Sequence, residues 1–219
     1  MSVPISKSII IISKLTELTS LSSNILGESM SKRMDKAARR EQLLSIAVSI
    51  IKDRGAEALT LATVAEQAGV TKPVAYNHFE TRENLLKQIY QDIDNRLIES
   101  IQTAKESSSQ SVTDTVSILC ESYFKCMQVN SEIYGLTVAA LKCYPNNAEL
   151  TKNIQDFFVK AYSDIFQLPL SDENHQNRLK LISVYGLIES VGDAAISGQV
   201  PKDVALTYLN EAVYQILIK

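Results

Sequence analysis

The stretch "GVTKPVAYNHF", residues 69–79, decides how this chain is interpreted. It lies between two segments with helical apolar spacing, and it carries a Lys, a Tyr, an Asn and a His within a few positions. Pro73 falls in the first turn of the helix predicted over 71–78, where a missing N–H costs nothing. Ala75 and Phe79 fall one turn apart on the inward side. The pattern predicts a short helix held from behind by a small core, with its polar side chains facing outward.

The segments on either side predict three more helices. Asp35 is a suitable cap for a first helix, and Gly55 suits its left-handed end. Thr60 caps a second helix, "LATVAEQA", which only the connection "AGV" separates from the polar helix. A connection of this length containing Gly is typical of a helix-turn-helix unit. Thr81 caps a longer fourth helix. Its apolar residues repeat at three and four positions and are Leu86, Ile89, Ile93, Leu97 and Ile101.

The outward residues match the chemistry of a helix that reads DNA. Lys72 offers a donor to a phosphate or a guanine, Asn77 can bond an adenine edge, and Pro73 can contact a thymine methyl. Three hydroxyl groups can bond phosphates, and they belong to Thr60, Thr71 and Tyr76. The sequence therefore predicts a recognition helix that enters the major groove of a duplex.

With these residues the chain resembles TetR/AcrR-type transcriptional regulators, whose N-terminal signature is similar to "TLATVAEQAGVTKPVAYNHFETRENLL", residues 60–86. The resemblance runs over residues 40–86, about a fifth of the chain. It implies a homodimer whose two recognition helices enter successive major grooves of a palindromic operator in double-stranded DNA. It also implies a C-terminal body that binds a small-molecule effector and so releases the DNA, with repression as the usual outcome.

The chain departs from the family pattern at several positions that bear on DNA contact. Ala62 stands where many relatives have a polar residue, and Val74 replaces a frequent Thr or Ser. Arg82 stands where the family usually has Lys, and the resemblance implies that it keeps a phosphate contact. His78 either bonds a phosphate or satisfies a carbonyl in the head. The predicted DNA-binding residues are Thr60, Thr71, Lys72, Pro73, Val74, Tyr76, Asn77, His78 and Arg82.

Charge divides the chain in a way that agrees with an anionic partner for its first part. Residues 30–105 carry 12 Lys and Arg against 10 Asp and Glu, whereas residues 106–219 carry 8 against 13. Five basic residues at the start of the first helix either follow the backbone of a duplex or form a solvated surface. They are Lys32, Arg33, Lys36, Arg39 and Arg40.

The fold class predicted from these patterns is all-α. Beyond the loop "ESSSQS", which marks a boundary in the chain, the apolar spacing predicts five further helices. Their ranges are 112–129, 132–144, 147–166, 173–197 and 202–218. The predicted domains are a tail over 1–34, a helix-turn-helix domain over 35–82, and a helical ligand-binding and dimerisation body over 83–219. Residues 1–29 are expected to be a flexible tail or a misassigned start, with Met30 and Met34 as alternative initiators.

Seven of the nine Tyr residues lie beyond the loop "ESSSQS", and the predicted effector pocket draws on them. Tyr185, Glu189 and Asp193 lie one turn apart. If that stripe faces the interior, its carboxylates beside a Tyr favour a cationic or amine-bearing ligand. If it faces water it carries no such meaning, and the sequence favours this second arrangement because carboxylates are mostly exposed. The candidate pocket residues are Tyr123, Tyr134, Tyr144, Tyr185 and Glu189.

The last two helices are predicted to form the homodimer contact. Gly186, Gly192 and Gly198 permit a second helix to approach closely, and the apolar face of the last helix is broader than one partner requires. Two-fold symmetry is the usual arrangement of such oligomers.

The inventory of reactive groups argues against other classes of protein. The two His residues lie in different predicted domains, and the sequence has neither a Gly-rich phosphate loop nor metal-ligand spacing, so no enzyme, metal or cofactor is expected. Three Cys residues without a CxxC pair indicate a reducing cytoplasm, and no apolar run approaches the roughly 20 residues of a membrane span. The rival hypotheses are a DNA-organising protein of the same fold without an effector, and a helical module that binds protein.

Overall fold

The computed structural model describes residues 35–109, 111–171 and 175–219. Within these ranges the chain forms helices joined by turns and contains no strand, so the predicted all-α fold is confirmed. Residues 36–219 form one compact unit. The expected tail and the alternative start sites at Met30 and Met34 lie outside the described residues. We use "head" for the elements before Thr81 and "body" for those after it.

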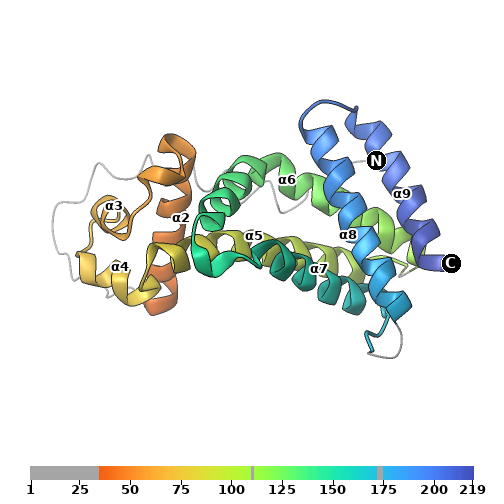
Figure 1. Cartoon of the computed structure of the whole chain (residues 1–219), viewed down its shortest axis with the longest axis horizontal. Coiled ribbons are helices and arrows are strands. Elements are labelled where there is room, and N and C mark those ends of the chain that lie inside the picture. Colours follow the sequence, from red (N-terminus) through yellow and green to blue (C-terminus); the bar gives the residue numbers. More distant parts are fainter. Residues whose placement is uncertain (1–34, 110, 172–174) are drawn as a thin grey trace, which may run out of the picture. The chain divides into compact units, whose positions relative to one another are not determined.

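The head begins with α2 (Lys36–Arg54) and a 3-10 turn, η1 (Ala56–Ala58), which are followed by α3 (Leu61–Gln67) and α4 (Lys72–Phe79) (Figure 1). Gly55 has a φ of 79° and Gly69 a φ of 65°, so both turns use the backbone freedom that only glycine has at low cost. Each of these positions was predicted to end a helix.

The caps explain where α3 and α4 begin. Thr60 and Thr63 form a capping box, in which each side chain accepts a hydrogen bond from the other's backbone N–H at 3.0 Å. Thr71 occupies the corresponding position before α4, but its side chain makes no capping bond. Thr71 is therefore the N-cap residue of α4 by position, without a side-chain bond. Pro73 in the first turn supplies a preset φ instead.

The helix α5 (Arg82–Glu106) runs without interruption from the head into the body. Thr81 caps it by accepting a hydrogen bond from the Asn84 amide at 3.1 Å. At 1.5 Å per residue its 25 residues extend over roughly 37 Å. All five predicted apolar positions of α5 are buried, so it contributes to the core along most of its length.

The helix α6 (Val112–Lys142) corrects the prediction of two helices broken near residue 130. Nothing at the expected break stops a helix, because residues 129–132 contain neither Gly nor Pro. The Asn130 side chain donates to the Cys126 carbonyl at 2.9 Å, a local bond that leaves the helix intact. A second 3-10 turn, η2 (Pro145–Asn147), then delays α7 to Leu150–Phe166, three residues later than expected.

The chain ends in the antiparallel pair α8 (His175–Ile196) and α9 (Lys202–Ile218), which pack on each other and on α6 (Figure 1). The core of the pair is formed by buried aliphatic side chains at three- and four-residue spacing. They are Leu181, Val184, Ile188, Ala205, Leu209, Val213 and Leu217.

Candidate functional site

The polar side of α4 lies open to solvent, as predicted. Lys72, Pro73 and Asn77 are exposed, and half of the Tyr76 surface is accessible. Ala75 and Phe79 are buried on the opposite side of the same helix. Burying Phe79 stabilises this arrangement by about 1.5–3 kcal/mol. The helix is thus fixed from behind while its outer surface remains available to a partner.

The other predicted contact residues surround this surface to different extents. The side chains of Thr60 and Thr71 are exposed, whereas Val74 and His78 are half-buried. The Thr60 hydroxyl is already engaged with Thr63 through the capping box. These placements leave Thr71 with the more available of the two hydroxyl groups.

Basic residues of α2 lie near the end of α4. Partial burial lowers the pKa of His78, and the positive charges of Lys36, Arg40 and Arg39 lower it further. The imidazole is therefore mainly neutral at pH 7 and retains both a donor and an acceptor. Three of the five basic residues named in the sequence analysis are thus close enough to His78 to act on its charge.

Arg82 is placed differently from the expected phosphate contact. Its guanidinium donates to the Leu59 carbonyl from Nε at 2.7 Å and to the Ala56 carbonyl from Nη2 at 2.8 Å. A third bond runs from Nη1 to the Tyr144 hydroxyl at 2.8 Å. The planar fork thus joins the turn before α3 to the turn after α6. Arg82 is therefore a structural link between head and body, and its contact with a phosphate stays a prediction.

A second set of bonds lies beside this link. Asn147 donates to Glu83 at 3.2 Å and to the Leu141 carbonyl at 3.1 Å. Glu83 also pairs with Lys87 at 2.7 Å, a bond that lowers the pKa of the Glu83 carboxyl. Tyr144, which was predicted to line the effector pocket, belongs to this junction instead. Its hydroxyl accepts from Arg82, which the residue spacing gave no means of anticipating.

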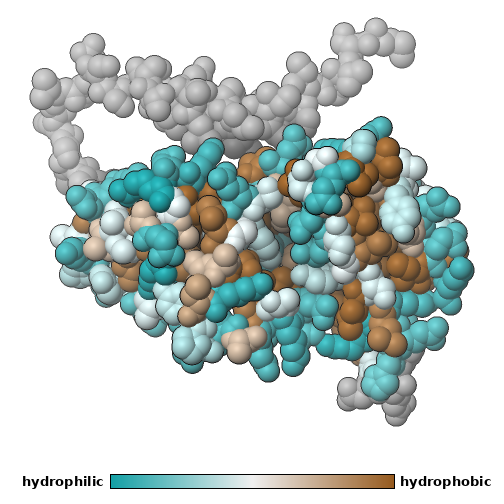
Figure 2. Space-filling view, turned by 45° about the horizontal axis from the view of Figure 1, so that its top comes forward, coloured by the Kyte–Doolittle hydropathy of each residue, from teal (hydrophilic) through white to brown (hydrophobic). Residues whose placement is uncertain are grey.

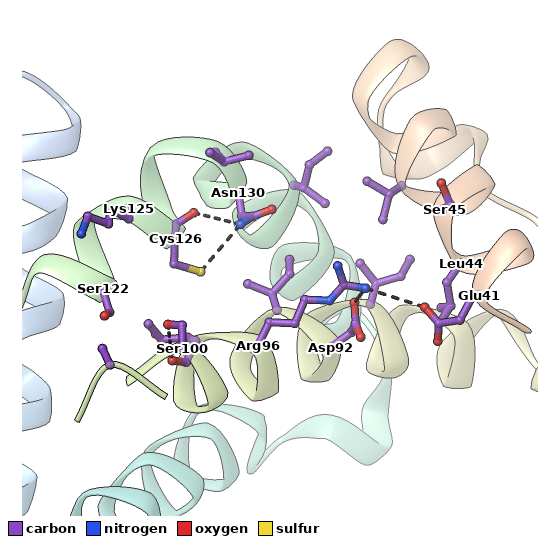
Figure 3. A pocket seen from close by; sticks show the side chains of 17 residues that line it. Glu41, Leu44, Ser45, Asp92, Arg96, Ser100, Ser122, Lys125, Cys126 and Asn130 are labelled. Atoms are coloured by element: carbon purple, nitrogen blue, oxygen red, sulfur yellow. Dashed lines mark hydrogen bonds and ion pairs between the residues drawn. The ribbon is translucent and has the colours of Figure 1, made fainter. Parts of the chain in front are cut away.

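A hollow of about 720 Å³ lies between α2, α5 and α6 (Figure 3). Arg96 spans it, bonding Asp92 at 2.9 Å on its own helix and reaching Glu41 of α2 at 3.7 Å. The four-residue spacing of Asp92 and Arg96 is readable from the sequence, but the contact with Glu41 depends on how the head packs. None of the five predicted pocket residues lines this hollow.

Four of the predicted pocket residues do come together inside the body. Tyr123 is buried and Tyr134, Tyr185 and Glu189 are half-buried. Tyr123 donates a hydrogen bond to Glu189, and burial raises the pKa of the Glu189 carboxyl to about 7, helped by the negative charge of Asp193. Glu189 therefore faces inward, contrary to the exposed arrangement that the sequence favoured.

Asp94 of α5 is the member of this group that the sequence prediction missed. It is 2% exposed and accepts a hydrogen bond from Tyr134. Burial raises its pKa to about 7, and the charge of Glu189 adds to the effect. A signal was available, because Asp94 lies four residues after Tyr90 and three before Leu97, on the apolar side of the helix.

The lack of a side chain at Gly192 leaves the space that the ring of Tyr123 occupies. A Cβ on Gly192 would lie 2.3 Å from Cε1 of that ring. This position was expected to let another helix approach closely, and the helix that does so here is α6 of the same chain. A Cβ on Gly186, in contrast, would meet nothing within 4 Å, so this position stays compatible with the expected contact.

The described residues contain no group of three or more His, Cys, Asp or Glu side chains able to hold a metal ion. None of the helices in the same ranges combines the length and the apolar character that crossing a membrane requires.

Comparison with known proteins places these features in a family. The sequence model of the bacterial regulatory proteins of the tetR family matches residues 43–89, from within α2 to within α5. The HTH-type transcriptional repressor KstR2 of Mycolicibacterium smegmatis is 25% identical over 161 residues, which cover 69% of this chain and 75% of that protein. The fatty acid metabolism regulator protein of Bacillus subtilis is 23% identical over 83% of this chain and 90% of its own length.

Solved structures share the fold over most of the chain. A TetR-family transcriptional regulator from Rhodococcus sp. superposes with a TM-score of 0.65 at 18% identity, covering 84% of this chain and all of that one. The fatty acid degradation regulator FadR from Bacillus halodurans superposes with a TM-score of 0.57 at 20% identity over 84% of this chain and 96% of its own. The helix-turn-helix head, the helical body and these relatives agree in supporting a TetR-family transcriptional regulator, with the family match itself confined to the head.

Proposed function

We propose that this protein binds a palindromic operator as a homodimer, acts as a repressor, and leaves the DNA when a small-molecule effector binds its body. The observation that carries the proposal is the two-sided build of α4, with Ala75 and Phe79 buried and Lys72, Tyr76 and Asn77 open. Such a helix presents hydrogen-bonding groups to a major groove without disturbing its own core.

Base reading is assigned to three exposed residues of α4. Lys72 and Asn77 supply the groups that recognise guanine and adenine, and Pro73 supplies an apolar contact for a thymine methyl. Tyr76, Thr71, Thr60 and His78 are assigned to phosphates or sugars, which position the helix without reading sequence. Val74 lies between these residues and contributes only apolar contact. Arg82 is left out of this set because three of its five N–H donors already bond within the chain.

The homodimer is assigned to the outer surface of α8 and α9. Figure 2 shows hydrophobic side chains gathered over this end of the compact unit. Large apolar residues are exposed there, and they are Leu179, Ile196, Val204, Tyr208 and Ile218. A contiguous apolar surface of this kind is typical of a protein interface. Two-fold symmetry through this surface matches the symmetry of a palindromic operator.

Coupling between the body and the DNA is assigned to α5 and Arg82. The helix begins beside α4 and continues into the body, and Arg82 bonds the head carbonyls and Tyr144 together. A change in the body that tilts α5 therefore moves α4 with it. Half-sites on a duplex lie about 34–36 Å apart, so a change in the separation of the two recognition helices weakens binding. By linkage, DNA weakens effector binding equally.

The test uses the full chain and duplexes selected by it from a random library. Fluorescence anisotropy on a selected duplex should show affinity that falls by roughly 0.9 log unit per log unit of salt for each phosphate neutralised. The selected duplexes should carry an inverted repeat. Absence of duplex binding would overturn the regulator assignment, and selected sequences without inverted symmetry would overturn the palindromic operator.

A single substitution then tests the base-reading assignment. Lys72→Ala should reduce the preference for a selected over a random duplex by about 5-fold or more. Lys125→Ala is the matched control, because Lys125 is exposed on α6 in the body and pairs with Glu121 of the same helix. Equal losses on selected and random DNA for Lys72→Ala would remove Lys72 from the base-reading residues.

A further inference from the structure

A second, smaller cavity of about 220 Å³ lies between α5 and α7. Its lining combines two aromatic rings, an aliphatic side chain, three amides and one carboxyl group. These residues are Tyr90, Gln91, Asp94, Asn95, Asn153, Ile154 and Phe157. Gln91, Asn95 and Asn153 are exposed and form its opening, whereas Tyr90, Asp94 and Ile154 are buried and form its inner wall.

Asp94 lines this cavity, and one of its carboxylate oxygens has no partner within the described part of the protein. The residue is 2% exposed, and its Oδ1 atom has no hydrogen-bond partner among the described residues. Buried polar atoms nearly always have a partner, because an unsatisfied one carries a desolvation cost of about 1–3 kcal/mol. A ligand that donates an N–H to Oδ1 would recover that cost.

Aromatic rings flank the same acceptor. The ring of Tyr90 is 7% exposed and meets Tyr134 edge-on at 6.5 Å, and Phe157 meets Phe158 edge-on at 5.2 Å. These contacts hold both rings in place beside the cavity, although 36% of Phe157 remains accessible from outside. The faces of aromatic rings attract a cation and accommodate an alkyl chain.

The one charged residue that lines the cavity, Asp94, is acidic. None of the seven lining residues is basic. Behind Asp94, the Glu189 carboxyl is close enough to disfavour its ionisation. A ligand carrying a carboxylate would meet two acidic groups and would find no basic partner, whereas a ligand carrying an ammonium group would be attracted by both.

We propose that this cavity binds a protonated primary or secondary alkylamine, whose N–H donates to Asp94 Oδ1 while its alkyl part lies between Tyr90 and Phe157. The volume restricts the ligand to a small molecule, since cavities for drug-sized ligands start at about 300 Å³. The proposal deepens the proposed function, on which it rests for the claim that the bound amine is the effector.

Isothermal titration calorimetry on the full chain without DNA tests the binding step. The probes are n-butylammonium chloride, 1-butanol and sodium butyrate, which share one chain length and differ in the charge and donor of their head group. Butylammonium should bind at least 10-fold more tightly than butanol, and butyrate should not bind. Equal binding of butylammonium and butanol, or tighter binding of butyrate, would overturn the proposal.

Asp94→Asn locates the site. The substitution keeps the shape and leaves an acceptor for the Tyr134 hydroxyl, so the fold should be retained, and it should weaken butylammonium binding at least 10-fold. Glu99→Gln removes an exposed carboxylate of the same helix and should leave the affinity unchanged. Unchanged affinity in Asp94→Asn would place the amine elsewhere and overturn the proposal. The comparison of the three probes on the unsubstituted chain stands even if a variant folds poorly.

A separate measurement distinguishes this proposal from the proposed function. Butylammonium is added to the complex of the chain with a selected duplex. Release of the duplex supports both the amine-binding cavity and the role of the amine as effector. Amine binding without release keeps the cavity assignment and removes the effector role, whereas duplex binding with no amine binding keeps the regulator and removes the cavity assignment.

Discussion

The Arg82 guanidinium donates to the Tyr144 hydroxyl at 2.8 Å, joining the first residue of α5 to the turn that follows α6. The same guanidinium also bonds the Ala56 and Leu59 carbonyls of the head. The Arg82 side chain therefore contacts both the head and the body. Removing any of the three bonds should therefore change both stability and the coupling between effector and DNA.

Tyr144→Phe tests this link without changing side-chain shape. It leaves one N–H of a charged group without its partner, and the partial exposure of Arg82 limits the effect, so the free energy of unfolding should fall by about 1 kcal/mol. Urea denaturation measures that loss. Arg82→Lys should cost more, because an ammonium cannot reproduce the planar fork. If both variants unfold like the parent chain, the link contributes nothing to stability.

Gly192→Ala should destabilise the body through the ring of Tyr123. The added methyl group would lie 2.3 Å from Cε1 of a buried ring, and overpacking of this kind costs about 1–3 kcal/mol. Gly135→Ala is the matched control on α6, because an added Cβ there would meet nothing within 4 Å and helix propensity favours Ala by roughly 1 kcal/mol. Thermal denaturation should show opposite signs for the two variants. A shift of the same sign and size in both would mean that Tyr123 moves aside without cost.

Stability should fall as the pH rises from about 4 to 7. The pKa values of Asp94 and Glu189 are raised to about 7 in the folded chain, from ordinary values of 3.8 and 4.5. The folded state thus binds more protons than the unfolded state in this window, so deprotonation favours unfolding. Asp94→Asn should make the free energy of unfolding vary less with pH. It should also raise that free energy at pH 8 by about 1–2 kcal/mol. Urea denaturation from pH 4 to pH 8 measures both, and an unchanged slope would contradict the burial of an ionisable Asp94.

Amine affinity should change with pH in the opposite sense. Butylammonium stays charged below pH 9, so its affinity should rise between pH 6 and 8 as Asp94 loses its proton. The groups facing Asp94 are Tyr90 on its own helix, Tyr134 and Cys126 on α6, Tyr162 on α7, and Tyr185 and Glu189 on α8. Among them only Glu189 also titrates near neutrality. Calorimetry on Glu189→Gln should retain most of the pH effect, and Asp94→Asn should abolish it.

A charge on the outer surface of α9 should separate the proposed dimer. Val204 is 52% exposed there, and Val204→Asp should shift the chain toward monomer in analytical ultracentrifugation. It should also weaken binding to a selected duplex at least 10-fold, because one head alone has fewer contacts. Val129→Asp, at a position 78% exposed on α6, is the control. A dimer that persists in Val204→Asp would move the interface away from α9.

The head was predictable from sequence because its signals are local. Gly55, Gly69, Thr60 and Pro73 act on their own turns, and Ala75 and Phe79 share a side by spacing alone. The interior of the body was not predictable in this way. Whether Glu189 faces water depends on the position of α6, which brings Tyr123 to it, and no spacing within α8 carries that information.

Long-range packing explains the other differences. The partners of Arg82 lie 23, 26 and 62 residues away, so family resemblance suggested a phosphate where the fold supplies two carbonyls and a hydroxyl. The expected break near residue 130 does not occur, because residues 129–132 contain neither Gly nor Pro and the helix continues through them.

Arg96 has a consequence for how salt titrations on DNA are interpreted. Its contact with Glu41 is solvent-exposed, so added salt weakens the electrostatic tether between α2 and α5. Added salt then weakens DNA binding in two ways. It screens the phosphates, and it lets the head of each protomer turn more freely relative to its body. A count of phosphates taken from the salt slope alone would be too large, and Arg96→Gln should bring the slope closer to the number of contacts made.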